Sequence, residues 1–193
     1  MTILLLTGPP AAGKTTIAAA LAARVTDPLA VIEVDTLRHM IVEPHSAPWD
    51  GEEGHRQQLL GVRNACVLAQ NFDATGFHVL IVDPITEESA VRYREELVLT
   101  IVRLLPNWAQ TMIRSQTRDE PLGFRERELL YEQQKQLQAV DITLDNSSLE
   151  PNIVAGRLER LLTSTPPNPP PPPQAGYHAL PNPLPPPSEG APR

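Results

Sequence analysis

The residues whose types and spacing most clearly predict chemistry lie in the segment TGPPAAGKTT, near the start of the chain. It contains the pattern GxxxxGK[ST], in which glycines let backbone N–H groups turn toward a polyphosphate. Lys14 would reach the β- and γ-phosphates, and the Thr15 hydroxyl would ligate Mg²⁺. Lysine is rare here, since Lys135 is the only other one among 16 basic residues. We therefore predict a nucleotide-binding loop formed by Gly8, Pro9, Pro10, Ala11, Ala12, Gly13, Lys14, Thr15 and Thr16.

A second candidate is the pair Asp35 and Arg38 in the segment VDTLRHM, which follows an apolar run. Their spacing of three places both on one side of the first turn of a helix. A carboxylate beside a nucleotide could take the proton from an acceptor hydroxyl, while Arg38 holds the acceptor. The alternative is that Asp35 only caps the helix and Arg38 is a surface residue. The spacing alone leaves both interpretations open.

Asp83 is the third candidate, because it closes the apolar segment FHVLIVD and precedes a proline. An acid at the end of a buried strand is the Walker-B pattern, in which it holds Mg²⁺ through water. Strands also end in Asp for reasons of turn geometry, which is the alternative. The predicted metal residues are therefore Thr15 and Asp83.

Basic residues gather around a Pro-Gly loop in the segment RSQTRDEPLGFRER. A mobile lid could bring such guanidinium groups onto a transferring phosphoryl group. For some of them the alternative is a solvated helix face. The four arginines are Arg114, Arg118, Arg125 and Arg127. After the last apolar segment, the residues DNSS would either line an adenine pocket or cap the final helix.

The acceptor is expected over the segment 43–58, between the second strand and a long helix. Trp49 could stack on a ring of the acceptor there. Arg56 or Arg63 could hold an anionic group. Cys66 lies within a helical apolar run, so we expect it in the core rather than as a nucleophile.

Strands and helices alternate along the chain. Short apolar segments predict strands at 2–7, 29–34, 77–83, 97–106 and 141–145. Helices are expected at 14–24, 52–75, 87–95, 107–117, 125–137 and 148–162, the last with Ser148 as N-cap. The segment 97–106 could also extend the preceding helix, but its β-branched residues favour a strand. The order predicts an α/β protein of three layers, with a five-stranded parallel sheet covered by helices on both faces.

Composition divides the chain into a folded domain at 1–163 and a tail at 164–193. Of the 22 prolines, 13 lie in the last 28 residues. Such a segment cannot bury enough apolar surface to offset the entropy of ordering, so a disordered tail with polyproline II character is expected. It would either dock a partner protein with an aromatic groove or have no specific partner.

Charge and cysteine content limit the environment and the partners. The net charge of −7 argues against a general nucleic-acid or anionic-membrane binder, although a local basic groove stays compatible with it. A single cysteine excludes an intramolecular disulfide and suits a reducing compartment. We find no apolar run of transmembrane length and no signal peptide, so we expect a cytoplasmic protein without membrane contact.

Four segments of the sequence together resemble those of the small P-loop phosphotransferases. They are the loop GPPAAGKTT, the DTLR segment, the VD that closes the third strand and the R-x-x-x-R entering the lid. This group contains chloramphenicol phosphotransferase, the zeta toxins and the kinase domain of polynucleotide 5′-kinases, together with uncharacterised bacterial ATP-binding proteins of the AAA type. The similarity spans roughly residues 1–163 in element order. It implies a P-loop NTPase fold.

The resemblance also implies roles for single residues. Lys14 and Thr15 would handle phosphates and Mg²⁺, and Asp35 would be the general base. Arg38 would contact the acceptor, and Arg118, with Arg114 behind it, would be the lid arginine. Thr36 follows Asp35 where many relatives carry a second acid.

Three hypotheses about function follow. The leading one is an ATP-dependent kinase acting on a hydroxyl of a small molecule, and the absence of the base-reading pattern NKxD favours ATP over GTP. The second is a 5′-hydroxyl polynucleotide kinase, which the acidic body disfavours because a phosphate backbone needs a cationic track. The third is an ATP-binding switch or scaffold that docks partners through its tail. A plausible base, Asp35, distinguishes the first two from the third.

Overall fold

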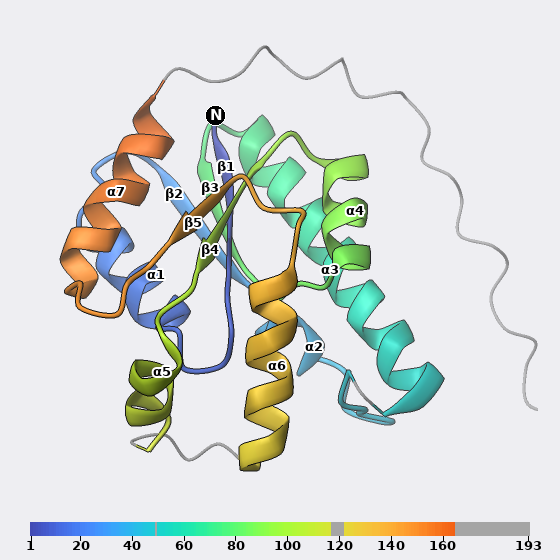
Figure 1. The fold of residues 1–193 in the computed structure, drawn as a ribbon. Coiled ribbons are helices and arrows are strands. Elements are labelled where there is room, and N and C mark those ends of the chain that lie inside the picture. Colours follow the sequence, from blue (N-terminus) through green and yellow to red (C-terminus); the bar gives the residue numbers. More distant parts are fainter. Residues whose placement is uncertain (49, 117–121, 165–193) are drawn as a thin grey trace, which may run out of the picture.

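A single parallel sheet of five strands forms the centre of the computed structural model, which describes residues 1–48, 50–116 and 122–164 (Figure 1). The strand order is β2-β3-β1-β4-β5, and every neighbouring pair is parallel. The strands are β1 (Ile3–Thr7), β2 (Leu29–Glu33), β3 (His78–Val82), β4 (Thr100–Leu104) and β5 (Ile142–Leu144). The order confirms the predicted α/β fold.

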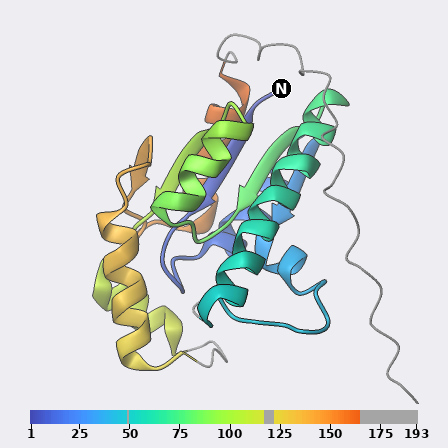
Figure 2. The same ribbon diagram turned by 90° about the vertical axis from the view of Figure 1, so that its right-hand side faces the viewer.

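Helices cover both faces of the sheet, as Figures 1 and 2 show from two directions. On one face α1 (Lys14–Ala22) packs beside α7 (Pro151–Thr163), and on the other α3 (Gly51–Ala74) packs beside α4 (Glu87–Glu96). Three further helices begin beyond the carboxyl ends of the strands. They are α2 (Val34–Arg38), α5 (Trp108–Ser115) and α6 (Phe124–Gln136).

The central strands supply the core on both sides. In β1, Ile3 and Leu5 join the apolar cluster under α3 and α4, whereas Leu4 and Leu6 join the cluster under α1 and α7. Successive side chains of a strand point to opposite faces, so a strand covered on both sides must be apolar throughout.

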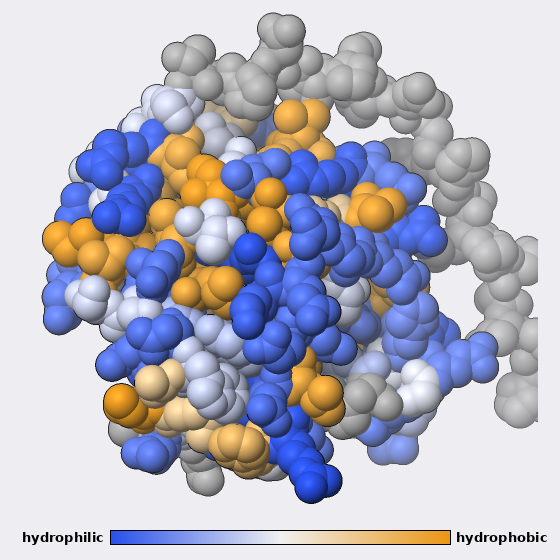
Figure 3. All heavy atoms as spheres, in the orientation of Figure 1, coloured by the Kyte–Doolittle hydropathy of each residue, from blue (hydrophilic) through white to orange (hydrophobic). Residues whose placement is uncertain are grey.

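The face seen in Figure 3 is mainly hydrophilic, with apolar residues interspersed.

Cys66 is buried in the cluster under α3 and α4, so its predicted core position is confirmed. Burial raises the pKa of its thiol to about 12, with smaller contributions from the carboxylates of Glu96 and Asp83. The thiol therefore stays protonated at neutral pH and is a poor nucleophile.

The five predicted strands and six predicted helices are found in the predicted order, with differences at their ends, and α2 (Val34–Arg38) is a further short helix that the list of expected helices lacks. The ambiguous segment 97–106 contains strand β4, which pairs with β1 and β5. One prediction about a cap is wrong. Helix α7 begins at Pro151 with Glu150 as its N-cap residue, so Ser148 does not cap it.

All five strands end at the same edge of the sheet, because they are parallel and in close register. The loops that follow them therefore share one end of the molecule, the lower end in Figure 1. This is where ligands bind in open α/β sheets.

The predicted Pro-rich tail lies almost wholly outside the described residues, so its disorder and docking stay predictions. Within the described part of the chain, no helix is long and apolar enough to cross a membrane.

Candidate functional site

The loop between β1 and α1 has the backbone geometry that its glycines predict. Gly8 has φ 146° and Gly13 has φ 93°, values that favour glycine, and Ala11 between them also has a positive φ of 60°. A Cβ atom on Gly8 would lie 2.4 Å from the carbonyl oxygen of Leu104, so no larger residue fits without a backbone shift. The loop is therefore held against the end of β4.

Lys14 is the first residue of α1, and its side chain turns back over this loop. Its Nζ donates hydrogen bonds to the carbonyl oxygens of Gly8 at 2.8 Å and Pro9 at 3.0 Å. The ammonium group and the N-terminus of α1 thus put positive charge at the same place. Thr15 and Thr16 follow on the first turn and are exposed.

Asp83 directly follows β3, the neighbour of β1, and its carboxyl group is buried. The Oη of Tyr93, in α4, donates a hydrogen bond to Asp83 Oδ2 at 2.8 Å. The pKa of Asp83 is raised to about 7, mainly by burial and to a smaller extent by the nearby charge of Asp35, while the hydrogen bond from Tyr93 and the charges of Lys14 and Arg38 lower it. These four groups thus lie close enough to act on one carboxyl.

Asp35 lies in α2 and faces solvent, with 63% of its side chain exposed. Helix α2 begins at Val34 with Glu33 as its N-cap residue, so Asp35 is not the cap of this helix. The carboxylate Oδ1 lies 3.6 Å from Nη1 of Arg38. An exposed carboxylate just after β2, on the same edge of the sheet as the loop that follows β1, has the chemistry of a proton acceptor.

Arg38 is largely buried, with 11% of its side chain exposed, so it is not a surface residue. Its aliphatic part packs against α3, where a Cβ on Gly61 would lie 2.8 Å from Arg38 Cγ. Its Nη2 donates to the carbonyl oxygen of Ser46 at 3.1 Å. Gln57 of α3 also holds this loop, accepting from Ser46 N and donating to the carbonyl of Pro44.

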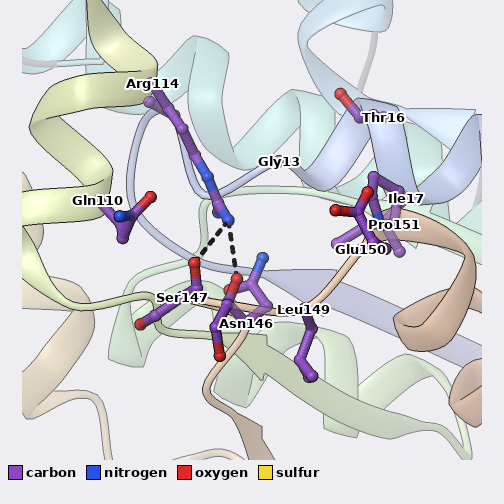
Figure 4. Close-up of a pocket in the computed structure, with 12 residues that line it drawn as sticks. Gly13, Thr16, Ile17, Gln110, Arg114, Asn146, Ser147, Leu149, Glu150 and Pro151 are labelled. Carbon is purple, nitrogen blue, oxygen red and sulfur yellow. Dashed lines mark hydrogen bonds between the residues drawn. The ribbon is translucent and has the colours of Figure 1, made fainter.

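A hollow of about 440 Å³ lies on the other side of the loop, between α1, α5 and the segment that joins β5 to α7 (Figure 4). Arg114 of α5 reaches across it and donates to the carbonyl oxygens of Asn146 at 2.7 Å and Ala12 at 3.4 Å. Asn146 also donates to Ala12, at 2.9 Å. The lining residues are Ala11, Gly13, Thr16, Ile17, Gln110, Arg114, Asn146, Ser147, Ser148, Leu149, Glu150 and Pro151.

The DNSS segment therefore lines a hollow rather than capping α7. Ser147 accepts from the backbone N–H of Asn107 through its Oγ at 2.8 Å, which ties the segment to the start of α5. Of the predicted nucleotide residues, Ala11, Gly13, Thr16 and Arg114 line this hollow.

The structure does not bring every predicted residue to this end. Arg63 is exposed on α3 and lines a separate hollow of about 280 Å³ with Leu59, Val62, Cys66, Arg92 and Glu96. Arg56 pairs with Glu53 on the same helix at 2.7 Å. Arg118 and Trp49 lie outside the described residues. In α6, Arg125 is exposed and Arg127 donates to Ser115 Oγ at 3.4 Å.

Sequence reasoning missed Tyr93 and Gln134. Gln134, buried in α6, accepts from Thr7 Oγ1 at 3.1 Å and donates to the carbonyl of Ile85 at 2.7 Å. It thus joins the last residue of β1 to the segment that follows β3. A lone polar residue on a helix predicts nothing, so no local signal could have found either residue.

No protein-family model and no curated protein matches this chain. Solved structures do share its fold. The tunicamycin resistance protein of Deinococcus radiodurans superposes with a TM-score of 0.66 at 16% identity, over 86% of this chain and 99% of that one. A shikimate kinase from Acinetobacter baumannii, solved with shikimate, has a TM-score of 0.59 at 18% identity, over 84% and 93%. A sugar kinase from Janibacter has 0.59 at 18% identity, over 82% and 92%.

These likenesses define the class of fold. The chain has the α/β fold of the P-loop kinases, which agrees with the predicted fold and with the order of its strands. At identities of 16–18% they establish the fold alone, so function must be argued from the residues.

Proposed function

We propose that this protein transfers the γ-phosphoryl group of ATP to a hydroxyl group of a small molecule. The observation that supports it most strongly is geometric: the loop before Lys14, the helix with Asp35 and Arg38, and Asp83 follow β1, β2 and β3, three adjacent strands of one parallel sheet, and Arg38 lies 3.6 Å from Asp35. A phosphate-binding cation, a proton acceptor, an acceptor-side cation and a metal-side acid are the groups that phosphoryl transfer needs.

The loop geometry fits a polyphosphate. The positive φ angles at Gly8, Ala11 and Gly13 turn the chain around Lys14, and the closeness of Gly8 to Leu104 leaves room for nothing larger than glycine. When bound, ATP with Mg²⁺ supplies the phosphoryl group and neutralises its charge. Lys14 would bind the phosphates, and Thr15 and Asp83 would hold the ion, Asp83 through water.

The hollow beside Arg114 would take the nucleoside. It opens next to the phosphate loop, since Gly13 and Thr16 belong to both. Its volume of about 440 Å³ falls in the range of small-ligand sites. Arg114 and Asn146 both donate to Ala12 and thus tie the walls of the hollow to the loop.

On the acceptor side, Asp35 would accept the proton of the attacking hydroxyl. Arg38 would set the position of that acceptor, because its guanidinium group lies near Asp35 and holds Ser46 of the neighbouring loop. Arg118 is proposed as the arginine that closes over the phosphates, on the resemblance to small P-loop kinases. Trp49 stays a proposed acceptor contact, whereas Arg63 lies in another hollow and the mechanism does not use it.

The test is ATP turnover against a panel of hydroxyl metabolites, with a 5′-hydroxyl oligonucleotide included. Lys14→Ala should lose nucleotide binding, because the loop would lose its cation. Asp35→Asn should bind ATP normally yet fail to transfer. The proposal is contradicted if the wild-type protein phosphorylates no hydroxyl compound of the panel. It is also contradicted if Asp35→Asn transfers phosphate at the normal rate.

A further inference from the structure

Tyr93 is a buried tyrosine whose hydroxyl contacts the acid at the metal side of the site. It lies on α4 in the apolar cluster under that helix and has 0% of its surface exposed. Its Oη donates to Asp83 Oδ2 at 2.8 Å. A buried phenol needs a hydrogen-bond partner, and here the partner is a carboxylate at the end of a strand ten residues earlier.

Only one oxygen of the Asp83 carboxyl accepts a hydrogen bond from a side chain among the described residues. Oδ2 is bound to the phenol, while 6% of the residue remains exposed. Asp83 follows β3, the strand that lies between β1, which leads into the loop before Lys14, and β2, which leads into α2. The phenol therefore fixes Oδ2 on the side of α4, and no side chain among the described residues donates a hydrogen bond to Oδ1.

Helix α4 holds Tyr93 firmly in this position. Its N-terminus has a capping box in which Thr86 and Ser89 bond reciprocally. It is tied to α3 by the hydrogen bond between His55 Nε2 and Glu88 Oε2 at 2.8 Å and by Gln70, which donates to the carbonyl of Glu96 at 3.0 Å. A donor on a rigid helix can orient a carboxylate more closely than a donor on a loop.

We propose that Tyr93 is a positioning residue for Mg²⁺: by holding Oδ2 of Asp83, it aims Oδ1 at the phosphate loop, where that oxygen holds the hydration shell of the ion. The proposal rests on the proposed function. Tyr93 touches neither nucleotide nor acceptor. Partners that orient a metal-holding group typically change metal affinity ten- to hundredfold when removed.

The test compares Tyr93→Phe with Tyr131→Phe. Tyr131 is also a buried tyrosine, and its hydroxyl donates to the carbonyl of Pro106 at 3.0 Å, so its variant loses a buried phenol bond elsewhere. Binding of a fluorescent ATP analogue is measured over a range of Mg²⁺ concentrations and in EDTA. Tyr93→Phe should need about tenfold more Mg²⁺ for half-maximal binding. Its affinity in EDTA, and the Mg²⁺ requirement of Tyr131→Phe, should match the wild type.

An unchanged Mg²⁺ requirement in Tyr93→Phe overturns the inference. Equal increases of the Mg²⁺ requirement in the two variants also overturn it, because the loss of any buried tyrosine hydroxyl would then raise the requirement. Failure of the proposed function looks different: either the wild-type protein binds no nucleotide with Mg²⁺, and the inference falls with it, or it binds nucleotide and phosphorylates no acceptor, and the Mg²⁺ comparison of the two variants still tests the inference.

A measurement on the unmodified sequence covers the case in which Tyr93→Phe does not fold. The chain has three tyrosines, which can be labelled as fluorotyrosine and followed by ¹⁹F NMR. The Tyr131→Phe and Tyr177→Phe variants assign the signals. Adding Mg²⁺ to the nucleotide-bound protein should move the Tyr93 signal more than that of Tyr131. A Tyr93 signal that does not respond contradicts the inference.

Discussion

Asp35 and Asp83 follow neighbouring strands of the sheet, yet the protein surrounds them differently. Strand β2 is at the edge and β3 is next to it, with β1 on its other side. Asp35 has 63% of its side chain in solvent, whereas Asp83 is 6% exposed and bonded to Tyr93. Under the proposed function, these two acids, which look alike in the sequence, have two tasks: exchanging a proton with an arriving hydroxyl, and holding an ion from a fixed position.

The cause of the difference is the covering helix. Helix α4 lies over the end of β3 and brings an aromatic residue to Asp83, while α2 is a single short helix that leaves Asp35 open. Solvent access lets a carboxylate exchange protons, and burial with one strong donor fixes its orientation.

The largest effect is expected from Asp35→Asn, which removes the proposed proton acceptor and keeps the shape of the side chain. The rate of phosphoryl transfer should fall about 10³-fold, as is typical for loss of a general base. Because the side chain is exposed, the free energy of unfolding should change by less than about 0.5 kcal/mol. Single-turnover kinetics and chemical denaturation measure the two effects. A fall in stability as large as the fall in rate would mean that Asp35 is structural.

Asp83→Asn should make the ligand-free protein more stable at high pH. The folded-state pKa of about 7 lies above the ordinary value of 3.8, so folded protein binds this proton more tightly than unfolded protein does. The stability that this group contributes is fully present below about pH 4 and is lost as the pH rises to about 7. At pH 8 the variant should therefore exceed the wild type by about 2 to 4 kcal/mol, since each pKa unit is worth ~1.4 kcal/mol.

Denaturation with urea between pH 5 and pH 8 checks this, with Asp35→Asn as the matched exposed control. The gain in Asp83→Asn should grow with pH, while the control stays level with the wild type. A constant difference across this range would show that the Asp83 carboxyl is not the group responsible.

The same variant should weaken the ion site more than Tyr93→Phe does. Asp83→Asn should raise the Mg²⁺ concentration for half-maximal nucleotide binding by about 30-fold, because the amide carries no charge to hold the hydrated ion. In the double variant, adding Tyr93→Phe should cause little further change, since both act through one carboxyl. Additive effects would mean that Tyr93 acts by another route.

The smallest effect is expected from Arg38→Met on stability. The thioether side chain can replace the aliphatic part that packs on Gly61, and the lost ion pair with the exposed Asp35 at 3.6 Å is weak. The free energy of unfolding should change by less than about 1 kcal/mol. The KM for the acceptor should rise severalfold while the affinity for ATP stays the same. A change in ATP affinity alone would mean that Arg38 contacts the nucleotide rather than the acceptor.

Periodicity and turn residues predicted much of the fold. The five apolar segments became the five strands, and the β-branched residues of 97–106 correctly favoured a strand over a longer helix. The cap of α7 was placed wrongly, because both Ser148 and Glu150 precede Pro151 and the sequence does not say where the turn ends. The positions of Arg63 and Arg56 depend on which side of α3 faces the site, which spacing alone did not resolve.

The sequence by itself determined the turn between β1 and α1, because glycine spacing and the lysine that follows act within one short stretch of backbone. It also determined that an acid closes β3, since an apolar run and its last residue are adjacent in the chain. Only the tertiary structure decided that Asp83 is buried and Asp35 exposed, that Tyr93 bonds one of them, and that Arg114 and Asn146 meet at Ala12. The physical reason is that burial and hydrogen bonding depend on which elements pack together, and these residues come from elements far apart in the chain.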